Sequence, residues 1–168
     1  MRPGRRLGVD AGQARVGVAT CDPDAILATP LATLDRREAT DEEVASAIVR
    51  MAREHEAIEI ILGLPLHMSG REGEAARAAR ELGAAIVRCG APAVRLLDER
   101  LTTVQAQAHL REAGRPARRQ RPVVDQAAAV VILQAALDAE RGAGGPPGQA
   151  LALDFRASSG TDERPASE

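Results

Sequence analysis

Residues 6–21, RLGVDAGQARVGVATC, decide the fold of this chain. Two short apolar runs, Arg6–Asp10 and Arg15–Cys21, flank a turn that contains Gly12. Apolar runs on either side of a glycine-containing turn predict a β-hairpin. The first run ends in Asp10, so the sequence places a carboxylate at the end of a strand.

The segments that follow predict an α/β fold with a mixed sheet, in which an antiparallel hairpin precedes parallel strands. Pro30 makes the strand at 28–34 an edge strand, because proline cannot donate a ladder hydrogen bond. Thr40 or Asp41 is placed to cap the first helix. We expect further strands at 58–62 and 94–97, and helices at 41–56, 73–87, about 102–113 and 125–140.

Length and composition indicate one domain. The chain has 168 residues, of which 45% are hydrophobic and 27% charged. We expect a folded domain over residues 1–142 and a disordered tail over 143–168, where Gly, Pro, Ser and charged residues accumulate. No segment has the length of a membrane span, and the N-terminus lacks the apolar stretch of a secretory signal. The sequence therefore predicts a cytoplasmic protein with no membrane partner.

The charge and side-chain inventory restricts how the chain can bind other molecules. The net charge is −2, and all 22 basic residues are arginine, which binds phosphate through a bidentate fork. There is no Trp or Tyr, and the only Phe is Phe155, so residues 1–142 cannot stack bases on aromatic rings. Cys21 and Cys89 have no nearby His or Cys partners in the sequence, and we expect free thiols.

Three acids stand where a site is expected: Asp10 ends the first strand, Glu99 follows the strand 94–97, and Asp125 opens the last helix. Ligands in open α/β sheets bind at the carboxyl ends of the strands. Carboxylates gathered there would repel one another unless a cation neutralises them, and hard oxygen ligands favour Mg²⁺ or Mn²⁺ over Zn²⁺.

Each acid also has a purely structural explanation. Asp10 can cap the turn that follows it, Asp125 can be a helix N-cap, and Glu99 can pair with Arg100 or Arg15. Asp98 competes for the role of Glu99, since successive residues point in different directions. The spacing alone does not show that the three acids converge.

Arginines cluster just before Asp125. A basic segment beside a catalytic acid is suited to hold a phosphate backbone, although it can equally be a solvated run of charge. Arg15 lies on a strand near the acids, where it can neutralise Asp10 or Glu99 or contact substrate phosphate. The clustered residues are Arg111, Arg115, Arg118, Arg119 and Arg121.

Four motifs, in order, resemble those of the YqgF/RuvX family. They are DAGQARVGVA at 10–19, the GLPL loop at 63–66 with Gly70, DERLTT at 98–103, and Val124-Asp125 with Ala128-Ala129. Together they span residues 5 to about 138. The chain departs from many members in having His67 where they have Asn, and Arg119 or Arg121 where they have Lys.

The resemblance implies a ribonuclease H-like three-layer fold and a metal-dependent nuclease linked to maturation of the 5′ end of pre-16S rRNA. The family's proposed catalytic acids correspond to Asp10, Glu99 and Asp125, which would hold Mg²⁺ or Mn²⁺ in a two-metal hydrolysis. Substrate binding is assigned to arginines at 15, 100, 115, 118, 119 and 121, and to Thr102.

Other functions stay open at this point. The family is related to Holliday junction resolvases, so branched DNA is an alternative to structured RNA. Resolving a four-way junction requires two sites related by symmetry, and both a monomer and a homodimer are compatible with the sequence. A non-catalytic module that binds RNA or a transcription complex is a further alternative. An actin-type phosphotransfer ATPase needs a second domain that a chain of 168 residues does not provide.

Overall fold

The computed structural model describes residues 1–102 and 121–152. Its centre is a six-stranded sheet of order β3-β2-β1-β4-β5-β6. β1 (Arg6–Ala11), β2 (Arg15–Cys21) and β3 (Ala28–Asp35) form an antiparallel meander. β4 (Glu59–Leu64) and β5 (Ala93–Asp98) continue the sheet in parallel with β1. The predicted mixed sheet is therefore confirmed, and β3 is an edge strand as Pro30 indicated.

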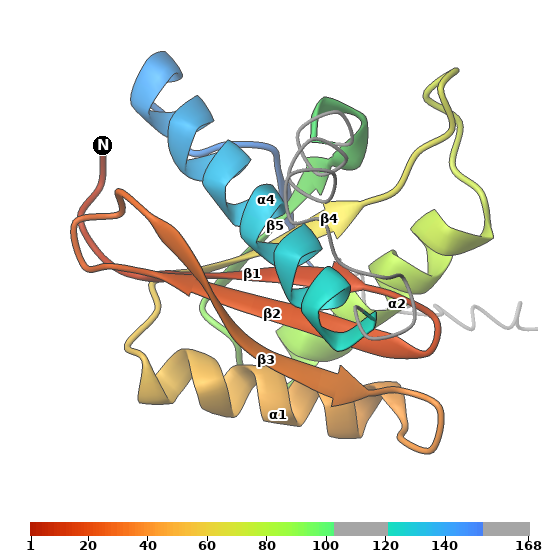
Figure 1. Ribbon diagram of the computed structural model, residues 1–168. Helices are drawn as coiled ribbons and strands as arrows, with labels where there is room; N and C mark the ends of the chain where they lie inside the picture. The colour runs from red at the N-terminus through yellow and green to blue at the C-terminus, as the bar shows by residue number, and fades with distance from the viewer. Residues whose placement is uncertain (103–120, 153–168) are drawn as a thin grey trace, which may run out of the picture.

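Helices cover both faces of the sheet (Figure 1). α1 (Asp41–Glu54) and α2 (Glu74–Arg88) pack on one face, over a core that includes Leu7, Val9 and Ile60. Of the helices in the described residues, α4 (Arg121–Ala143) is the one that crosses the other face, where it buries Ala129, Ile132 and Leu133 against the sheet. The result is a three-layer α/β/α arrangement. Of the candidate caps, Thr40 caps α1 through a capping box with Glu43.

The predicted start of the last helix was wrong. α4 already includes Arg121, so Asp125 lies in its second turn and is not its N-cap. Pro122 does not prevent this earlier start, because proline is tolerated in the first turn of a helix, where no intrahelical N–H bond is required. The helix predicted at about 102–113 lies almost entirely outside the described residues, which end at Thr102 and resume at Arg121.

The segment after 142 was expected to be disordered, and for part of it this is wrong. β6 (Gln149–Leu151) pairs antiparallel with β5, and Leu151 packs against the core between β5 and α2. A tertiary contact stabilises this three-residue strand, which no local pattern would indicate. Residues 153–168 lie outside the described part of the chain. Within the described residues, no helix is long and apolar enough to span a membrane.

Candidate active site

Strand alternation places the predicted acids on the face covered by α4. Along β1, Leu7 and Val9 belong to the core under α1 and α2, so Gly8 and Asp10 face α4. On β4 and β5, Ile61 and Leu97 pack against α4. Asp10 therefore approaches α4 from the middle of the sheet.

Asp10 and Asp125 are brought together by a glycine. Gly17 is the cross-strand partner of Asp10 in the β1–β2 hairpin. A Cβ on Gly17 would overlap the backbone carbonyl of Asp125, so α4 lies directly on the hairpin at this point. Close backbone approach of this kind requires glycine. The carboxylates of a strand and a helix that are 115 positions apart in the chain thus reach one site.

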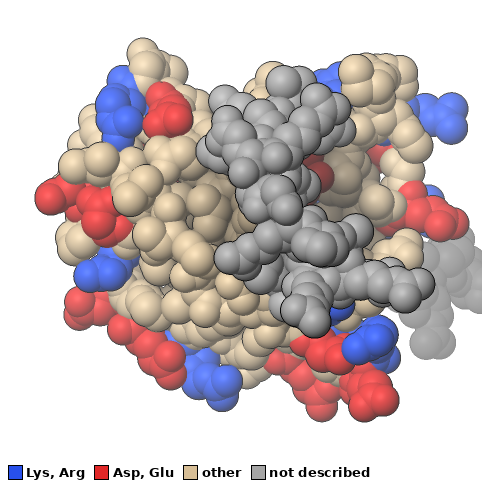
Figure 2. All heavy atoms as spheres, in the orientation of Figure 1, with Lys and Arg blue, Asp and Glu red and all other residues tan. Residues whose placement is uncertain are grey.

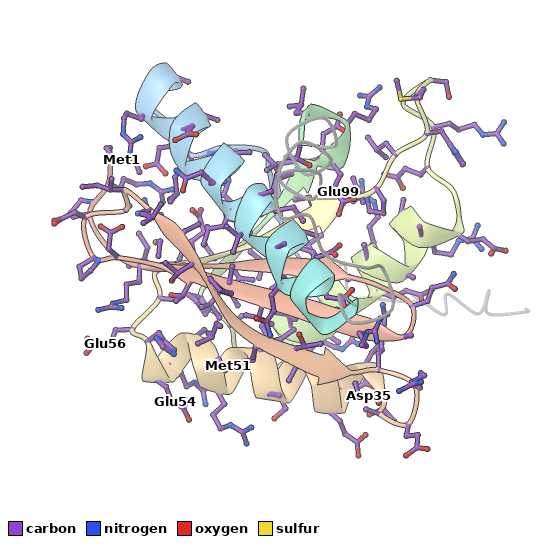
Figure 3. The ribbon with its side chains drawn as sticks, in the orientation of Figure 1. Met1, Asp35, Met51, Glu54, Glu56 and Glu99 are labelled. Atoms are coloured by element: carbon purple, nitrogen blue, oxygen red, sulfur yellow. The ribbon has the colours of Figure 1, made fainter. Side chains whose placement is uncertain are left out.

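Glu99 joins the cluster through a second glycine. It begins the short 3-10 helix η1 (Glu99–Leu101) directly after β5. Its carboxylate lies against Gly63 of β4, where a Cβ would overlap the Oε1 atom and approach Ile132 of α4 to 2.6 Å. Figure 3 labels Glu99 near the ends of β4 and β5. The glycine of the GLPL motif thus makes room for the carboxylate.

The pKa values of the acids show that they interact. Burial, together with the smaller effect of the negative charge of Asp125, raises the pKa of Asp10 to about 6. Burial, together with the smaller effects of the charges of Asp10 and Asp98, raises the pKa of Glu99 to about 7. Asp10 is thus linked electrostatically to both other acids. Perturbed carboxyl groups held together by a fold are typical of functional sites.

Arg15 pairs with the third acid. Its Nε donates to Oδ2 of Asp125 at 2.7 Å, and both side chains are largely buried. We expected a salt bridge from Arg15, but to Asp10 or Glu99. The partner differs because α4 lays Asp125 on β2, a long-range contact that the sequence does not reveal. Arg15 ties the hairpin to α4 at the site.

The neighbours of Glu99 have structural partners. Arg100 forms a bidentate ion pair with Asp98, whose pKa this pairing lowers. Glu99, rather than Asp98, is therefore the acid that lies against Gly63 and is coupled to Asp10. Thr102 is buried, and its hydroxyl donates to the carbonyl of Glu99 at 2.9 Å, which ends η1. Substrate contacts by Arg100 and Thr102 remain predictions.

The predicted basic segment lies mostly outside the described residues. Arg115, Arg118 and Arg119 fall in the gap, and Arg121 is described only as the first residue of α4. On the face shown in Figure 2, described acidic and basic side chains both occur round the rim. The phosphate contacts of these four arginines stay predictions.

The donor set fits a divalent cation. All three acids offer hard oxygen ligands, which Mg²⁺ and Mn²⁺ prefer. Burial and mutual repulsion raise the pKa values of Asp10 and Glu99 toward neutral pH. A bound cation would offset the repulsion between the carboxylates and favour their charged forms. Among the described residues, no three His, Cys, Asp or Glu side chains already enclose a metal position. Asp125 is engaged by Arg15 instead.

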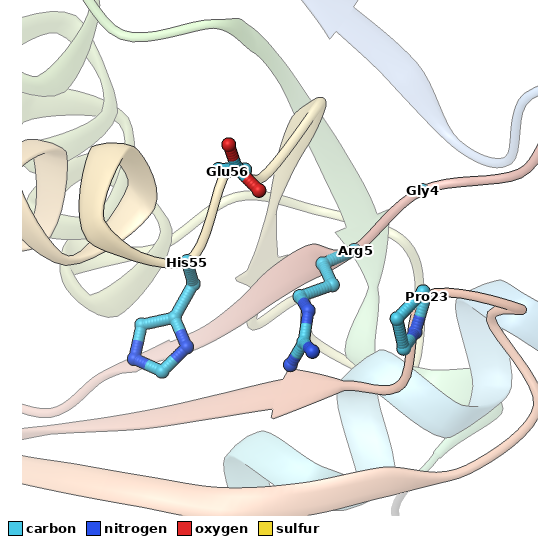
Figure 4. A pocket seen from close by; sticks show the side chains of 5 residues that line it. All are labelled: Gly4, Arg5, Pro23, His55 and Glu56. Carbon is cyan, nitrogen blue, oxygen red and sulfur yellow. The ribbon is translucent and has the colours of Figure 1, made fainter.

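A shallow pocket lies elsewhere, where the N-terminal segment meets the end of α1 (Figure 4). It holds about 200 Å³ and is lined by Gly4, Arg5, Pro23, His55 and Glu56. In Figure 3, Glu56 lies at the left edge of the molecule, whereas Glu99 lies right of the centre, near the end of β4. The pocket has a single exposed carboxylate, so it lacks the coupled acids of the candidate site. We therefore assign the chemistry to the acid cluster.

Comparisons with known proteins point to one family. The family described as "RuvX: Holliday junction resolvase" matches residues 4–139. A relative in Streptomyces avermitilis is 48% identical, covering 90% of this chain and 96% of its own. A relative in Thermobifida fusca is 50% identical, covering 89% and 96%. Both carry the curated name "Putative pre-16S rRNA nuclease".

Solved structures resemble the fold. RuvC of Thermus thermophilus, in complex with a Holliday junction substrate, superimposes with a TM-score of 0.59 at 12% identity. The match covers 88% of this chain and 99% of RuvC. RuvC alone gives a TM-score of 0.55 at 14% identity. These likenesses confirm the expected ribonuclease H-like three-layer fold.

Proposed function

The chain belongs to the RuvX family, and from that premise we propose that it is a metal-dependent nuclease that processes the 5′ end of pre-16S rRNA. The observation that carries this proposal is the electrostatic coupling of Asp10 to both Asp125 and Glu99 on one face of the sheet. A cluster of buried acids is a poor surface for binding phosphates by itself. It suits a protein that uses divalent cations to attack a phosphodiester bond.

The three acids come from different elements of the fold. Asp10, in the middle of the sheet between β2 and β4, would be a ligand of the divalent cation. Glu99, at the start of η1, and Asp125, on α4, would supply further oxygen ligands. Bound Mg²⁺ or Mn²⁺ would supply activation of water and neutralise charge on the leaving oxygen.

Arg15 keeps Asp125 oriented toward the cluster. A charged partner that fixes a ligating carboxylate in this way tunes the affinity for metal. The arginines at 115, 118, 119 and 121 are proposed to hold the RNA backbone, and the protein is proposed to act in the cytoplasm.

Cleavage of defined substrates tests the proposal. The wild-type chain is incubated with an RNA spanning the 5′ boundary of 16S rRNA and, separately, with a four-way DNA junction. Each substrate is tested with Mg²⁺, with Mn²⁺ and with a chelator. We expect metal-dependent cleavage of the RNA. Asp10→Asn should lower the cleavage rate by several orders of magnitude, because a carboxylate that holds the cation would contribute to transition-state stabilisation.

The controls separate the alternatives. Asp24→Asn removes an exposed acid remote from the cluster and should cleave like wild type. Cleavage of the junction in preference to the RNA would favour a resolvase. RNA binding without cleavage in any metal would favour a non-catalytic module and overturn the nuclease proposal.

A further inference from the structure

The loop between β4 and α2 is a braced hairpin that starts beside the acid cluster. Its base follows Gly63, the residue that contacts Glu99. Leu66 pairs with Glu72 across the hairpin, and Gly70, at a positive φ of 85°, allows the tight turn at its tip. Figure 1 shows this segment projecting from the end of β4. The hairpin therefore projects from the candidate site and can contact a substrate bound there.

The hairpin is held at several points. Within it, the N–H of His67 donates to the carbonyl of Arg71 at 3.0 Å. Arg80 of α2 pairs with Glu72 at the base, with an Nε–Oε1 distance of 2.9 Å. Leu66 packs against the core. These contacts give the tip a fixed position relative to the sheet.

Apolar side chains are exposed around this tip. Met68 is 90% exposed and Leu101 of η1 is 72% exposed, the two highest values among large hydrophobic side chains of the described residues. Arg100 connects their elements, since it precedes Leu101 and its Nη1 donates to the carbonyl of Met68 at 3.4 Å. Single exposed apolar residues need no explanation. Met68 and Leu101, however, lie on either side of Arg100 and next to Glu99, and this arrangement indicates a functional contact.

We propose that Met68 and Leu101 form an apolar contact for an unpaired base of the substrate strand next to the cleaved bond. This inference rests on the proposed nuclease function and adds a subsite to it. The occupant follows from position, because η1 and the hairpin adjoin Glu99 and are within reach of nucleotides next to a phosphate bound at the acid cluster. It follows also from chemistry, because Met makes favourable contacts with aromatic rings, and Met and Leu are among the apolar residues that proteins insert between base steps.

The absence of aromatic residues strengthens this assignment. Single-strand binders commonly stack bases on Phe, Tyr or Trp. This chain has no Trp or Tyr, and its one Phe is Phe155. Arg100 is engaged by Asp98, so its guanidinium supports the hairpin and the apolar side chains are left to meet the base.

Base unstacking measured by fluorescence tests the proposal. The full chain carrying Asp10→Asn, to suppress cleavage, is mixed in Mg²⁺ with RNAs that carry 2-aminopurine at successive positions around the cleaved bond. We expect increased fluorescence at a position next to that bond. Adding Met68→Ala should remove this increase and weaken binding about tenfold, the scale of one lost base contact. Leu101→Ala should weaken binding in the same direction.

Matched variants make the result specific. Met68→Leu keeps an apolar side chain and should preserve the signal, whereas Met68→Gln should lose it. Leu27→Ala removes an apolar side chain that is 60% exposed in the β2–β3 connection, away from the acid cluster, and should change nothing. Fluorescence and affinity that are unchanged in Met68→Ala would overturn the inference. The same result with wild-type cleavage of the RNA would leave the nuclease proposal standing. If the wild-type chain unstacks the base but does not cleave the RNA, the subsite inference stands and the nuclease proposal is overturned.

Discussion

Asp10 and Glu99 keep their protons to a higher pH in the folded chain than exposed carboxyl groups do, because burial disfavours their charged forms. Their pKa values rise from 3.8 to about 6 and from 4.5 to about 7. Between those values the folded state binds more protons than the unfolded state. The free energy of unfolding of the metal-free protein therefore falls as the pH rises through that window.

Replacing Asp10 by Asn should stabilise the metal-free protein above pH 7, because it removes a buried charge that repels Asp125 and Glu99. The difference between 3.8 and about 6 corresponds to about 3 kcal/mol at most. Thermal melts with a chelator should show Asp10→Asn melting several degrees above wild type at pH 8. The advantage should shrink toward pH 4. Equal melting temperatures at pH 8 would show that Asp10 is not held in a repulsive cluster.

Variants of Glu99 and of its neighbour Asp98 provide a test of metal binding and a matched control. Mg²⁺ or Mn²⁺ should raise the melting temperature of wild type, because a cation bound only to the folded state stabilises it. Glu99→Gln should reduce this increase, since it removes one of the proposed metal-binding carboxylates, which is coupled to Asp10. Asp98→Asn should keep most of it, because Asp98 pairs with Arg100. A larger loss in Asp98→Asn than in Glu99→Gln would reverse the assignment of the ligand.

At the scale of elements, α4 and the hairpin β1–β2 form the site by lying in direct contact. Gly17 and Gly8 both face α4, and a Cβ on Gly8 would lie 2.6 Å from Cβ of Leu133 and 2.8 Å from the carbonyl of Ala129. The two glycines let the helix settle onto the strands. The position of Asp125 depends on this contact.

Gly17→Ala should therefore disturb both stability and activity. The added Cβ overlaps the carbonyl of Asp125, so α4 must shift, at a cost of about 1–3 kcal/mol for overpacking. A displacement of about 1 Å at a catalytic group can cost about 100-fold in rate. Gly142→Ala is the control, because nothing lies within 4 Å of a Cβ there. If both variants melt and cleave like wild type, α4 does not lie on Gly17 as described.

Much of this element level could be predicted from the sequence, and the remainder depends on long-range contacts. The apolar runs and the capping residues identified β1, β2, β3 and α1, and strand-end positions identified Asp10 and Glu99. The partner of Arg15 was wrong because it depends on where α4 crosses β2. The start of α4 was wrong because Pro122 also fits a first turn. The prediction that the three acids lie together came from the motif resemblance, because the number of residues between them does not determine their distance in the folded chain.

At the scale of the whole molecule, acids at the two ends of the sheet differ in their pairing with arginine and in the direction of their pKa shifts. At the amino ends of β1 and β4, Glu140 and Glu59 are buried, and Arg2 bonds to both. Arg6 is a second basic partner of Glu140. The hydrogen bond from Arg2, with a smaller contribution from Arg6, lowers the pKa of Glu140 to about 2. At the carboxyl ends, Asp10 and Glu99 keep raised pKa values. The first end therefore has neutralised acids, whereas the second keeps the electrostatic repulsion that the proposed cation would relieve.

The edge strand β6 links the C-terminal segment to the strand that precedes Glu99. Gln149 pairs with Leu96, the guanidinium of Arg95 donates to the carbonyl of Gly148 at 3.0 Å, and Leu151 packs against the core. Ending the chain after Gly142 removes these contacts and exposes one edge of β5. Ending it after Ala152 keeps them.

The two truncations should therefore differ. We expect the chain that ends at Gly142 to melt several degrees below the chain that ends at Ala152. Full burial of an aliphatic side chain contributes about 1.5–3 kcal/mol, and the partly buried Leu151 contributes a share of that. RNA cleavage well below either melting temperature should be similar in the two chains, since β6 supplies none of the three acids. The comparison isolates β6, because both chains lack residues 153–168. Equal melting temperatures would show that the domain ends at α4 and that β6 adds nothing to its stability.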